Sequence, residues 1–374
     1  MDTTTPLTST PAPRGVLAGL GLAMLLPALG TSIANVALPT LARQFALPTT
    51  HVQWVVIAYL LTLTAAVVAA GRLGDLWGRR RLLLAGLALF ALASLAAGAA
   101  PGLGWLIAAR VAQGLGAAVM MALTLALVGE VVPKAQAGAA MGLLGTLSAV
   151  GTALGPSLGG LLLATWGWQA VFWVNVPLGL AALALAAWQL PAERATAPRT
   201  VGFDHLGTAL LALSLTAYAL AMTLQPAAWG RLNTGLLLAA ALGLAAFAWV
   251  ETRAPAPLLR LQTLREPAVA TGVAVNALIT TVVMATLVVG PFYLAGGLGL
   301  DAARMGLVMT TGPAVAALAG APAGKLADRL GAPRVTLAGR CSTQTRWGSR
   351  RFSSASSSGS APRRGRSGRC CRRS

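Results

Sequence analysis

Apolar stretches long enough to cross a lipid bilayer make up most of this sequence. A membrane-spanning helix needs about 20 predominantly apolar residues, and the chain offers ten such stretches between short polar segments. They lie at residues 16–41, 52–70, 82–100, 103–128, 138–164, 171–190, 206–224, 234–250, 268–294 and 302–323. Only 10% of the residues are charged, against about 25% in a soluble domain. The chain cannot cover a water-facing surface, and we predict an all-α integral membrane protein.

The basic residues between these stretches predict the orientation of the chain. Cytoplasmic loops of membrane proteins carry an excess of Lys and Arg. If residues 1–15 form a cytoplasmic tail, the cluster at 79–81 and most other basic residues fall inside, whereas Arg43, Arg231 and Arg304 fall outside. The polar start and the length of the first apolar stretch argue against a cleavable signal peptide. We expect a multi-pass protein in the lipid bilayer of the cell membrane, with a cytoplasmic N-terminus.

An internal repeat predicts how the helices are grouped. The segment GRLGDLWGRRR at 71–81 recurs as GKLADRLGAPR at 324–334, 253 residues later. Parallel repeats related by an axis along the membrane normal are a known membrane-protein arrangement. Because this offset is too long for six helices, two extra helices are expected between two bundles. The predicted parts are a six-helix bundle at 16–190, two central helices at 206–250 and the start of a C-terminal bundle, left incomplete, at 268–339.

The last 35 residues differ in composition from the rest of the chain. Residues 340–374 contain ten Arg, no acidic residue and all three Cys. The repeat stops at Arg340, inside an apolar stretch that begins at Val335. We interpret this Ser/Arg-rich tail as an out-of-frame or truncated reading of a gene that encoded further helices, with no nucleic-acid partner. The alternative is a genuine basic arm that binds RNA or anionic lipid.

The segment at 71–81 resembles the loop signature between the second and third helices of the major facilitator superfamily, a family of membrane transporters. Gly71, Gly74 and Gly78 are expected to let two helix ends and a tight turn approach closely. Asp75 is expected to cap a helix N-terminus and to pair with a nearby Arg. The resemblance implies a gating role, and the alternative is an ordinary basic loop. The candidate gating residues in the two copies are Gly71, Asp75, Gly78, Arg79, Arg80, Gly324, Asp328 and Arg334.

Arg110 is the one charge predicted to lie well inside a span. A charge at this depth is costly and is usually functional or paired with a polar neighbour, and Gln113 follows on the same helix face. The segment RVAQGLGAA at 110–118 resembles the intramembrane arginine motif of the superfamily. The resemblance implies proton coupling or substrate-dependent gating. Alternatively, the span begins later and Arg110 extends to the outer interface.

Small residues recur at every fourth position of the fifth predicted span. Gly151, Gly155 and Gly159 form a smooth face for close helix packing, and Pro156 removes a backbone hydrogen bond and kinks the helix. Together with Gly160 they belong to the segment GTALGPSLGG, which resembles the signature of the antiporters in the superfamily. The resemblance favours export over uptake, and the alternative is helix packing alone.

Two further segments, 29–39 and 166–177, resemble the fourteen-helix drug:proton antiporter branch, which also has two extra central helices. Trp166, Trp168 and Trp173 are expected to join an aromatic belt at the membrane interface. The branch implies a central cavity with polar groups and adaptable Met side chains. The lining candidates are Thr31, Ser32, Asn35, Met120 and Met121, together with Arg110 and Gln113.

The sequence departs from this branch at Gly30, where relatives usually carry Asp. None of the nine acidic residues lies near the middle of a predicted span, although proton antiport generally needs a carboxylate facing the cavity. Three explanations stay open: the acid lay in missing helices, Arg110 works with another partner, or the coupling differs. Glu130, at the inner end of the fourth span, is a weak substitute.

These features lead to three functional hypotheses. The first is an exporter of small amphipathic or hydrophobic molecules that works by proton antiport and alternating access. The second is a uniporter or symporter of a small metabolite, although sparse charge in the spans argues against an anionic or sugar-like substrate. The third is a non-transporting or non-functional membrane fragment. No enzyme, cofactor or metal site is expected, since no nucleophile–base pair, phosphate-binding loop or metal cluster occurs, and we expect a monomer.

Overall fold

The structure, a computed structural model, describes residues 14–190, 205–223, 230–253, 266–312, 314–315 and 318. All regular structure in these ranges is helical, and no strand occurs in them. Nine helical segments of the described part are long and apolar enough to cross a membrane. The predicted all-α membrane fold is therefore confirmed, and the described residues belong to one compact unit, Met1–Ala319.

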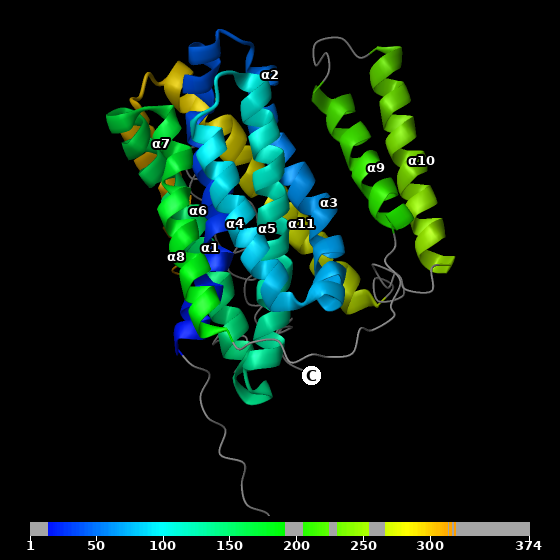
Figure 1. The fold of residues 1–374 in the computed structure, drawn as a ribbon. Helices are drawn as coiled ribbons and strands as arrows, with labels where there is room; N and C mark the ends of the chain where they lie inside the picture. The colour runs from blue at the N-terminus through cyan, green and yellow to red at the C-terminus, as the bar shows by residue number, and fades with distance from the viewer. Residues whose placement is uncertain are drawn as a thin grey trace, which may run out of the picture. The chain divides into compact units, whose positions relative to one another are not determined.

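Eight helices make the six spans of the N-terminal bundle (Figure 1). They are α1 (Arg14–Phe45), α2 (Thr49–Val52), α3 (Trp54–Trp77), α4 (Arg79–Gly98), α5 (Leu103–Val131), α6 (Lys134–Trp166), α7 (Trp168–Trp173) and α8 (Asn175–Gln189). The short helix α2 continues into α3, and α7 continues into α8, so each pair forms a single span.

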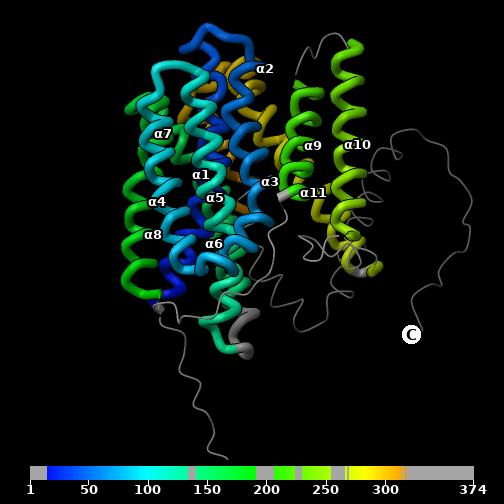
Figure 2. Tube along the Cα trace, turned by 45° about the vertical axis from the view of Figure 1, so that its right-hand side comes forward, coloured from blue at the N-terminus to red at the C-terminus, as the bar shows by residue number. Residues whose placement is uncertain are grey.

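The helices that follow form two further groups. The central pair consists of α9 (His205–Thr223) and α10 (Arg231–Arg253). Next come α11 (Pro267–Phe292), the π-helical turn η2 (Tyr293–Gly297) and a helix at 302–312. In both ribbon and tube views α9 and α10 lie side by side, and α9 contacts α3 (Figures 1 and 2). Helices are thus present at the positions predicted for the central pair and for the start of the C-terminal bundle.

Two clusters of buried apolar side chains hold the six spans together. One includes Leu20, Leu87 and Leu127, and the other includes Ile33 and Val171. Helix α1 contributes to both clusters and contacts α3, α5, α6, α7 and α8. The N-terminal bundle is therefore organised around α1, which brings the residues near position 30 against several neighbouring helices.

The connection between α3 and α4 is tighter than the sequence predicted. Residues 71–77 of the expected loop belong to the last turns of α3, and α4 begins at Arg79, so Gly78 alone joins the two helices. Gly78 has a φ of 98°, a backbone conformation that glycine adopts without a steric penalty. The signature is therefore a one-residue turn, and its charged side chains are held on two helix ends.

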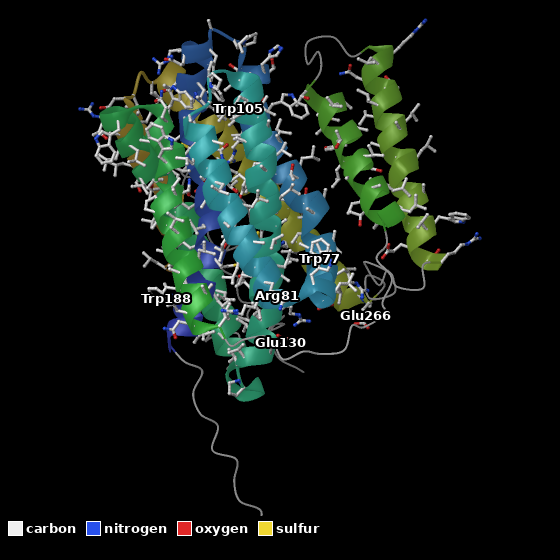
Figure 3. All side chains as sticks on the ribbon, viewed as in Figure 1. Trp77, Arg81, Trp105, Glu130, Trp188 and Glu266 are labelled. Carbon is white, nitrogen blue, oxygen red and sulfur yellow. The ribbon has the colours of Figure 1, made fainter. Side chains whose placement is uncertain are left out.

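Exposed tryptophan side chains lie at both ends of the bundle. Trp105 is near one end, and Trp77 and Trp188 are near the other, where Arg81 and Glu130 also lie (Figure 3). These three tryptophans are all more than half exposed. Because tryptophan is enriched at membrane–water interfaces, they mark the two levels between which the spans cross the apolar layer.

The three tryptophans of the predicted aromatic belt differ in exposure. Trp166 and Trp173 are exposed, as an interfacial position requires. Trp168 is buried instead, and it packs edge-on against the rings of Phe45 and Phe172. The prediction for Trp168 was wrong because its position in α7 turns the ring toward α1 rather than toward lipid.

Candidate functional site

Arg110 lies in α5 with its whole side chain buried. Its Nε donates a hydrogen bond of 2.8 Å to the carbonyl oxygen of Val55, and its Nη1 donates to Oε1 of Gln113. The guanidinium carbon lies 4.1 Å from the ring centroid of Tyr59 and 5.9 Å from that of Phe172. The side chain is therefore enclosed by groups from α3, α5 and α7 and does not extend to the interface.

A series of hydrogen bonds runs from Arg110 into α4. Arginine only donates, so the amide oxygen of Gln113 faces it and the amide nitrogen faces away. This nitrogen donates to Oγ of Ser94 at 2.8 Å, and the hydroxyl donates to the carbonyl oxygen of Phe90 at 2.6 Å. The spacing of Arg110 and Gln113 predicted their pairing. Nothing in the sequence singled out Ser94, since a lone serine in an apolar span is common.

The ring beneath the guanidinium is anchored on α1. Oη of Tyr59 donates a 3.0 Å hydrogen bond to the carbonyl oxygen of Pro27, which also accepts one of 2.9 Å from Oγ1 of Thr31. Through its contact with Arg110, this buried tyrosine joins α1 and α3 to α4 and α5. Sequence reasoning missed Tyr59. The available signal was that it is the only tyrosine of the N-terminal bundle.

One donor group of Arg110 has no hydrogen-bond partner. Nη2 is buried and makes no hydrogen bond to any residue that the structure describes. Among the residues that the structure describes, no carboxylate pairs with this guanidinium, and Asp75 and Glu130 pair with Arg79 instead. Leaving a buried donor unsatisfied costs about 1–3 kcal/mol, and more for a charged group. Within the described part of the chain, the positive charge of Arg110 is therefore stabilised by polar and aromatic groups and by no carboxylate.

Gly30 on α1 faces this network. A Cβ added at Gly30 would lie 3.3 Å from Cζ of Phe90 and 3.8 Å from Oη of Tyr59. A carboxylate carried by residue 30 would thus begin beside Tyr59, whose ring also lies against Arg110. In this chain glycine leaves that side of the network without an acid, and the ring of Phe90 packs there.

The residues predicted to line a cavity have different surroundings. Thr31 belongs to the polar network. Asn35 is fully buried, and its Nδ2 donates a 3.0 Å hydrogen bond to the carbonyl oxygen of Thr31. Its Oδ1 has no hydrogen-bond partner among the described residues. Ser32 faces α6, where its Oγ lies 3.3 Å from the carbonyl oxygen of Gly151. Of the two methionines, Met120 is part of the buried core and Met121 is half-buried.

Arg79 connects the ends of three helices. Its Nη2 lies 2.7 Å from Oδ1 of Asp75 at the end of α3, and its Nη1 lies 2.9 Å from Oε1 of Glu130 in α5. Nη1 also donates to the carbonyl oxygen of Ala126 at 3.2 Å. These side chains are between one quarter and just over one half exposed, so the ion pairs are partly screened by solvent.

Other residues of the first signature also join helices. Nη2 of Arg80 donates a 2.7 Å hydrogen bond to the carbonyl oxygen of Ala187 near the end of α8. Gly74 packs directly against the side chain of Leu123, leaving no room for a side chain of its own. Together with Arg79, these contacts tie α3 and α4 to α5 and α8.

Two expectations for this signature were wrong, and its second copy is not described. No described atom lies within 4 Å of a Cβ built at Gly71, so this glycine makes no close approach there. Asp75 caps no helix, because the N-cap of α4 is Gly78 and carries no side-chain cap. The residues Gly324, Asp328 and Arg334 lie outside the described residues.

The glycines of α6 pack against α1. A Cβ on Gly151 would lie 2.6 Å from the carbonyl oxygen of Leu25, and one on Gly155 would overlap the side chain of Ser32. A Cβ on Gly159 would lie 2.8 Å from the side chain of Ile33. The smooth face predicted from their spacing therefore lets the two helices pack with almost no side chain between them.

Gly160 points to a different helix. A Cβ there would run into the carbonyl of Ala302, and one on Gly306 would run into the carbonyl of Pro156. Helix α6 therefore makes backbone contact with the helix at 302–312. Pro156 itself lies inside α6, which is continuous from Lys134 to Trp166.

Residues 20–342 match the family model of the Major Facilitator Superfamily. The multidrug resistance protein Stp of Mycobacterium tuberculosis (strain CDC 1551 / Oshkosh) is 40% identical over 228 residues, which are 60% of this chain and 42% of that protein. The riboflavin transporter RibZ of Clostridioides difficile (strain 630) is 30% identical over 323 residues, which are 86% of this chain and 70% of that protein. The chain thus spans about two fifths of the length of Stp and more than two thirds of that of RibZ.

The structure of the xylose transporter XylE from E. coli, in a partially occluded inward-open conformation, has a similar fold. The two structures superpose with a TM-score of 0.55, covering 85% of this chain and 74% of that one, at 14% sequence identity. At this level of identity the likeness concerns the fold alone. It agrees with the arrangement of bundled helices derived above.

Proposed function

Because the chain belongs to the Major Facilitator Superfamily, whose members are transporters and not enzymes, we propose that it exports small amphipathic or hydrophobic molecules across the cell membrane. The mechanism would be alternating access, in which two helix bundles rock around a central site. The partners of the chain are then a small-molecule substrate and the bilayer.

The contact between α6 and the helix at 302–312 carries this proposal. At Gly160 and Gly306 two backbones meet without side chains between them. One helix belongs to the N-terminal bundle and the other follows the central pair, so the contact joins the two parts between which a substrate would pass. Small residues let helices approach and slide closely, which supports a contact that opens and closes.

Two observations support export and the fourteen-helix branch. The chain is similar to a protein named for multidrug resistance, and the glycine-rich segment of α6 resembles the antiporter signature. The central pair α9 and α10 is the kind of insertion that this branch has between its bundles. We propose that the chain derives from this branch.

Proton antiport is the coupling that the resemblance implies. Arg110 and Gln113 would take part in it, and Glu130 at the end of α5 is a weak candidate for the acid. The gating residues would be Asp75 and Arg79, whose ion pair holds two helix ends together. A proton gradient would then drive the cycle.

A uniporter or symporter of a small metabolite is the second candidate function. One observation favours it: within the described ranges, no carboxylate lies against Arg110. The likeness to a riboflavin transporter is compatible with this alternative. An antiporter and a uniporter differ in whether transport stops when the proton gradient is removed, and a proton symporter would move its substrate in the same direction as the protons.

Dye transport in everted membrane vesicles distinguishes these candidate functions. Vesicles with the full chain should accumulate the amphipathic anionic dye 8-anilino-1-naphthalenesulfonate when acidified inside, and nigericin should abolish the accumulation by removing the pH difference. Equilibration of dye or riboflavin that nigericin does not affect would favour the uniporter. Flux no greater than in vesicles without the chain would overturn transport and favour a non-functional fragment.

The orientation and the tail are also proposals. We propose a monomer with a cytoplasmic N-terminus, which is supported by the position of Arg81 at the end of the bundle where α1 begins (Figures 1 and 3). Alkaline phosphatase fused after residue 48 should be active, and after residue 133 inactive, because the enzyme folds only outside the cytoplasm. The reverse pattern would invert the topology.

We propose that residues 340–374 are read out of frame, since the family match ends at residue 342 and the composition changes at Arg340. The nucleotide sequence around codon 340 tests this. A second frame that encodes further apolar helices similar to the family supports the proposal. The absence of such a frame would contradict the proposal and favour a basic arm.

A further inference from the structure

We propose that Arg110 binds the negatively charged group of the substrate, so that this chain takes amphipathic molecules with an apolar body and one anionic group, such as a carboxylate. This inference rests on the proposed function and names the substrate class of the same site. It explains why a buried guanidinium in the bundle keeps one donor group unpaired.

The donor set of Arg110 is the first argument. Arginine carries five N–H groups in a rigid planar fork that matches the two oxygens of a carboxylate. In this chain Nε is used by the carbonyl of Val55 and Nη1 by Gln113, but Nη2 has no acceptor. The rings of Tyr59 and Phe172 lie against the guanidinium and contact it through their faces.

The charge balance is the second argument. A buried charge is costly unless an opposite charge accompanies it. Arg79 shows what this chain does elsewhere, since two carboxylates lie within 3 Å of it although it is partly exposed. Arg110 is fully buried and has no such partner among the described residues. A substrate that brings its own negative charge supplies the missing counter-ion.

The position of Gly30 is the third argument. An acid at residue 30 would begin beside Tyr59 and Phe90 and could neutralise Arg110 from within the protein. Glycine removes that internal counter-ion, so an anion from outside meets no like charge there. The sparse charge of the spans excludes a highly charged substrate, but a single anionic group on an apolar body needs only one arginine.

The sequence had argued against an anionic substrate on the ground that few charges lie in the spans. For molecules with one charge we infer the opposite, because no carboxylate of the described residues pairs with the buried guanidinium of Arg110. A cationic molecule of the same shape would be repelled by the guanidinium, and a neutral one would leave its charge unbalanced.

Binding to the purified full chain tests the inference independently of transport. The probes are 2-naphthoate, 2-naphthalenemethanol and 2-naphthylmethylammonium, which share one ring system and differ in charge. Equilibrium dialysis in detergent should show naphthoate bound about tenfold or more tightly than the alcohol, as a charge-assisted hydrogen bond requires, and the ammonium bound least. Arg110→Gln should remove this preference.

Gly30→Asp and Gly30→Asn form the matched pair of variants. Both side chains meet the same crowding from Phe90, and only Asp adds a charge. Gly30→Asp should lose the preference for naphthoate, whereas Gly30→Asn should keep it. Equal binding of the three probes to the unmodified chain, or equal effects of the two variants, would overturn the inference.

The outcome separates this inference from the proposed function. Selective binding of naphthoate in a chain that moves no dye would support the site and contradict the exporter. Proton-dependent export together with no preference for the anion would support the exporter and contradict the site.

Discussion

Gly160 on α6 and Gly306 after η2 meet backbone to backbone, because a Cβ built on either glycine would lie 3.2 Å from the Cα atom of the other. The contact leaves no space for any side chain larger than hydrogen. Since it joins the N-terminal bundle to a helix that follows the central pair, its closing and opening would be part of the transport cycle.

Substituting Gly160 should therefore block transport more than it affects folding. Gly160→Leu places a branched side chain in the contact, and overpacking of this kind costs about 1–3 kcal/mol in the closed state. We expect dye export to be lost while the amount of protein in the membrane stays near normal. Gly142→Leu is the control on the same helix, because no described atom lies within 4 Å of a Cβ there. Equal loss of export in both variants would contradict this role.

The packing of α6 on α1 should determine the stability of the bundle. Gly151→Ala pushes a methyl group to within 2.6 Å of the carbonyl oxygen of Leu25, and we expect it to destabilise the protein by about 1–3 kcal/mol. Gly145→Ala meets no described neighbour and gains helix propensity of up to about 1 kcal/mol. Thermal unfolding in detergent measures both. A Gly151→Ala protein as stable as Gly145→Ala would show that the helices separate easily.

Tyr59 should contribute through its ring more than through its hydroxyl group. Tyr59→Phe removes the hydrogen bond to Pro27, a loss of about 0.5–1.5 kcal/mol, but keeps a ring under Arg110. Tyr59→Leu also removes the cation–π contact, which is worth about 2 kcal/mol when desolvated. We expect the midpoint of thermal unfolding to fall slightly in Tyr59→Phe and further in Tyr59→Leu. The reverse order would assign the main role to the hydroxyl group.

The Arg79 ion pairs should affect transport with little effect on stability. Their side chains are partly exposed, and pairs of this kind contribute about 0–1 kcal/mol. We expect Asp75→Asn to leave thermal unfolding nearly unchanged. The rate of dye export should fall several-fold, because the ends of α3 and α4 lose the ion pair between Asp75 and Arg79. Asp301→Asn breaks a more exposed pair with Arg304 and should leave export unchanged. Similar rates in both variants would argue against gating.

The spans could be predicted from the sequence because a bilayer imposes a fixed length and a charge asymmetry on every helix that crosses it. Local spacing was also sufficient for Gln113, which lies one helical turn from Arg110, and for the glycines of α6. These features depend on the geometry of a single helix. Helical periodicity is therefore the reason why they were recoverable.

Contacts between helices could not be predicted in the same way. Ser94 and Tyr59 meet Gln113 and Arg110 only because α3 and α4 pack against α5 in one register. That register depends on how side chains of separate helices fit together, which a hydropathy pattern does not contain. Trp168 was misjudged for the same reason, since only its rotation about the axis of α7 decides between lipid and core.

Three hydrogen bonds form a series in which each group donates to the next. Arg110 donates to Gln113, Gln113 to Ser94, and Ser94 to the carbonyl oxygen of Phe90. A proton wire needs members that each take up a proton on one side and release another on the far side. A side-chain amide and a peptide carbonyl do neither near neutral pH, so this series ends without an outlet. In proton antiport, Arg110 and Gln113 would therefore need a further group outside this series, such as a water molecule or an acidic side chain, to take up and release the proton.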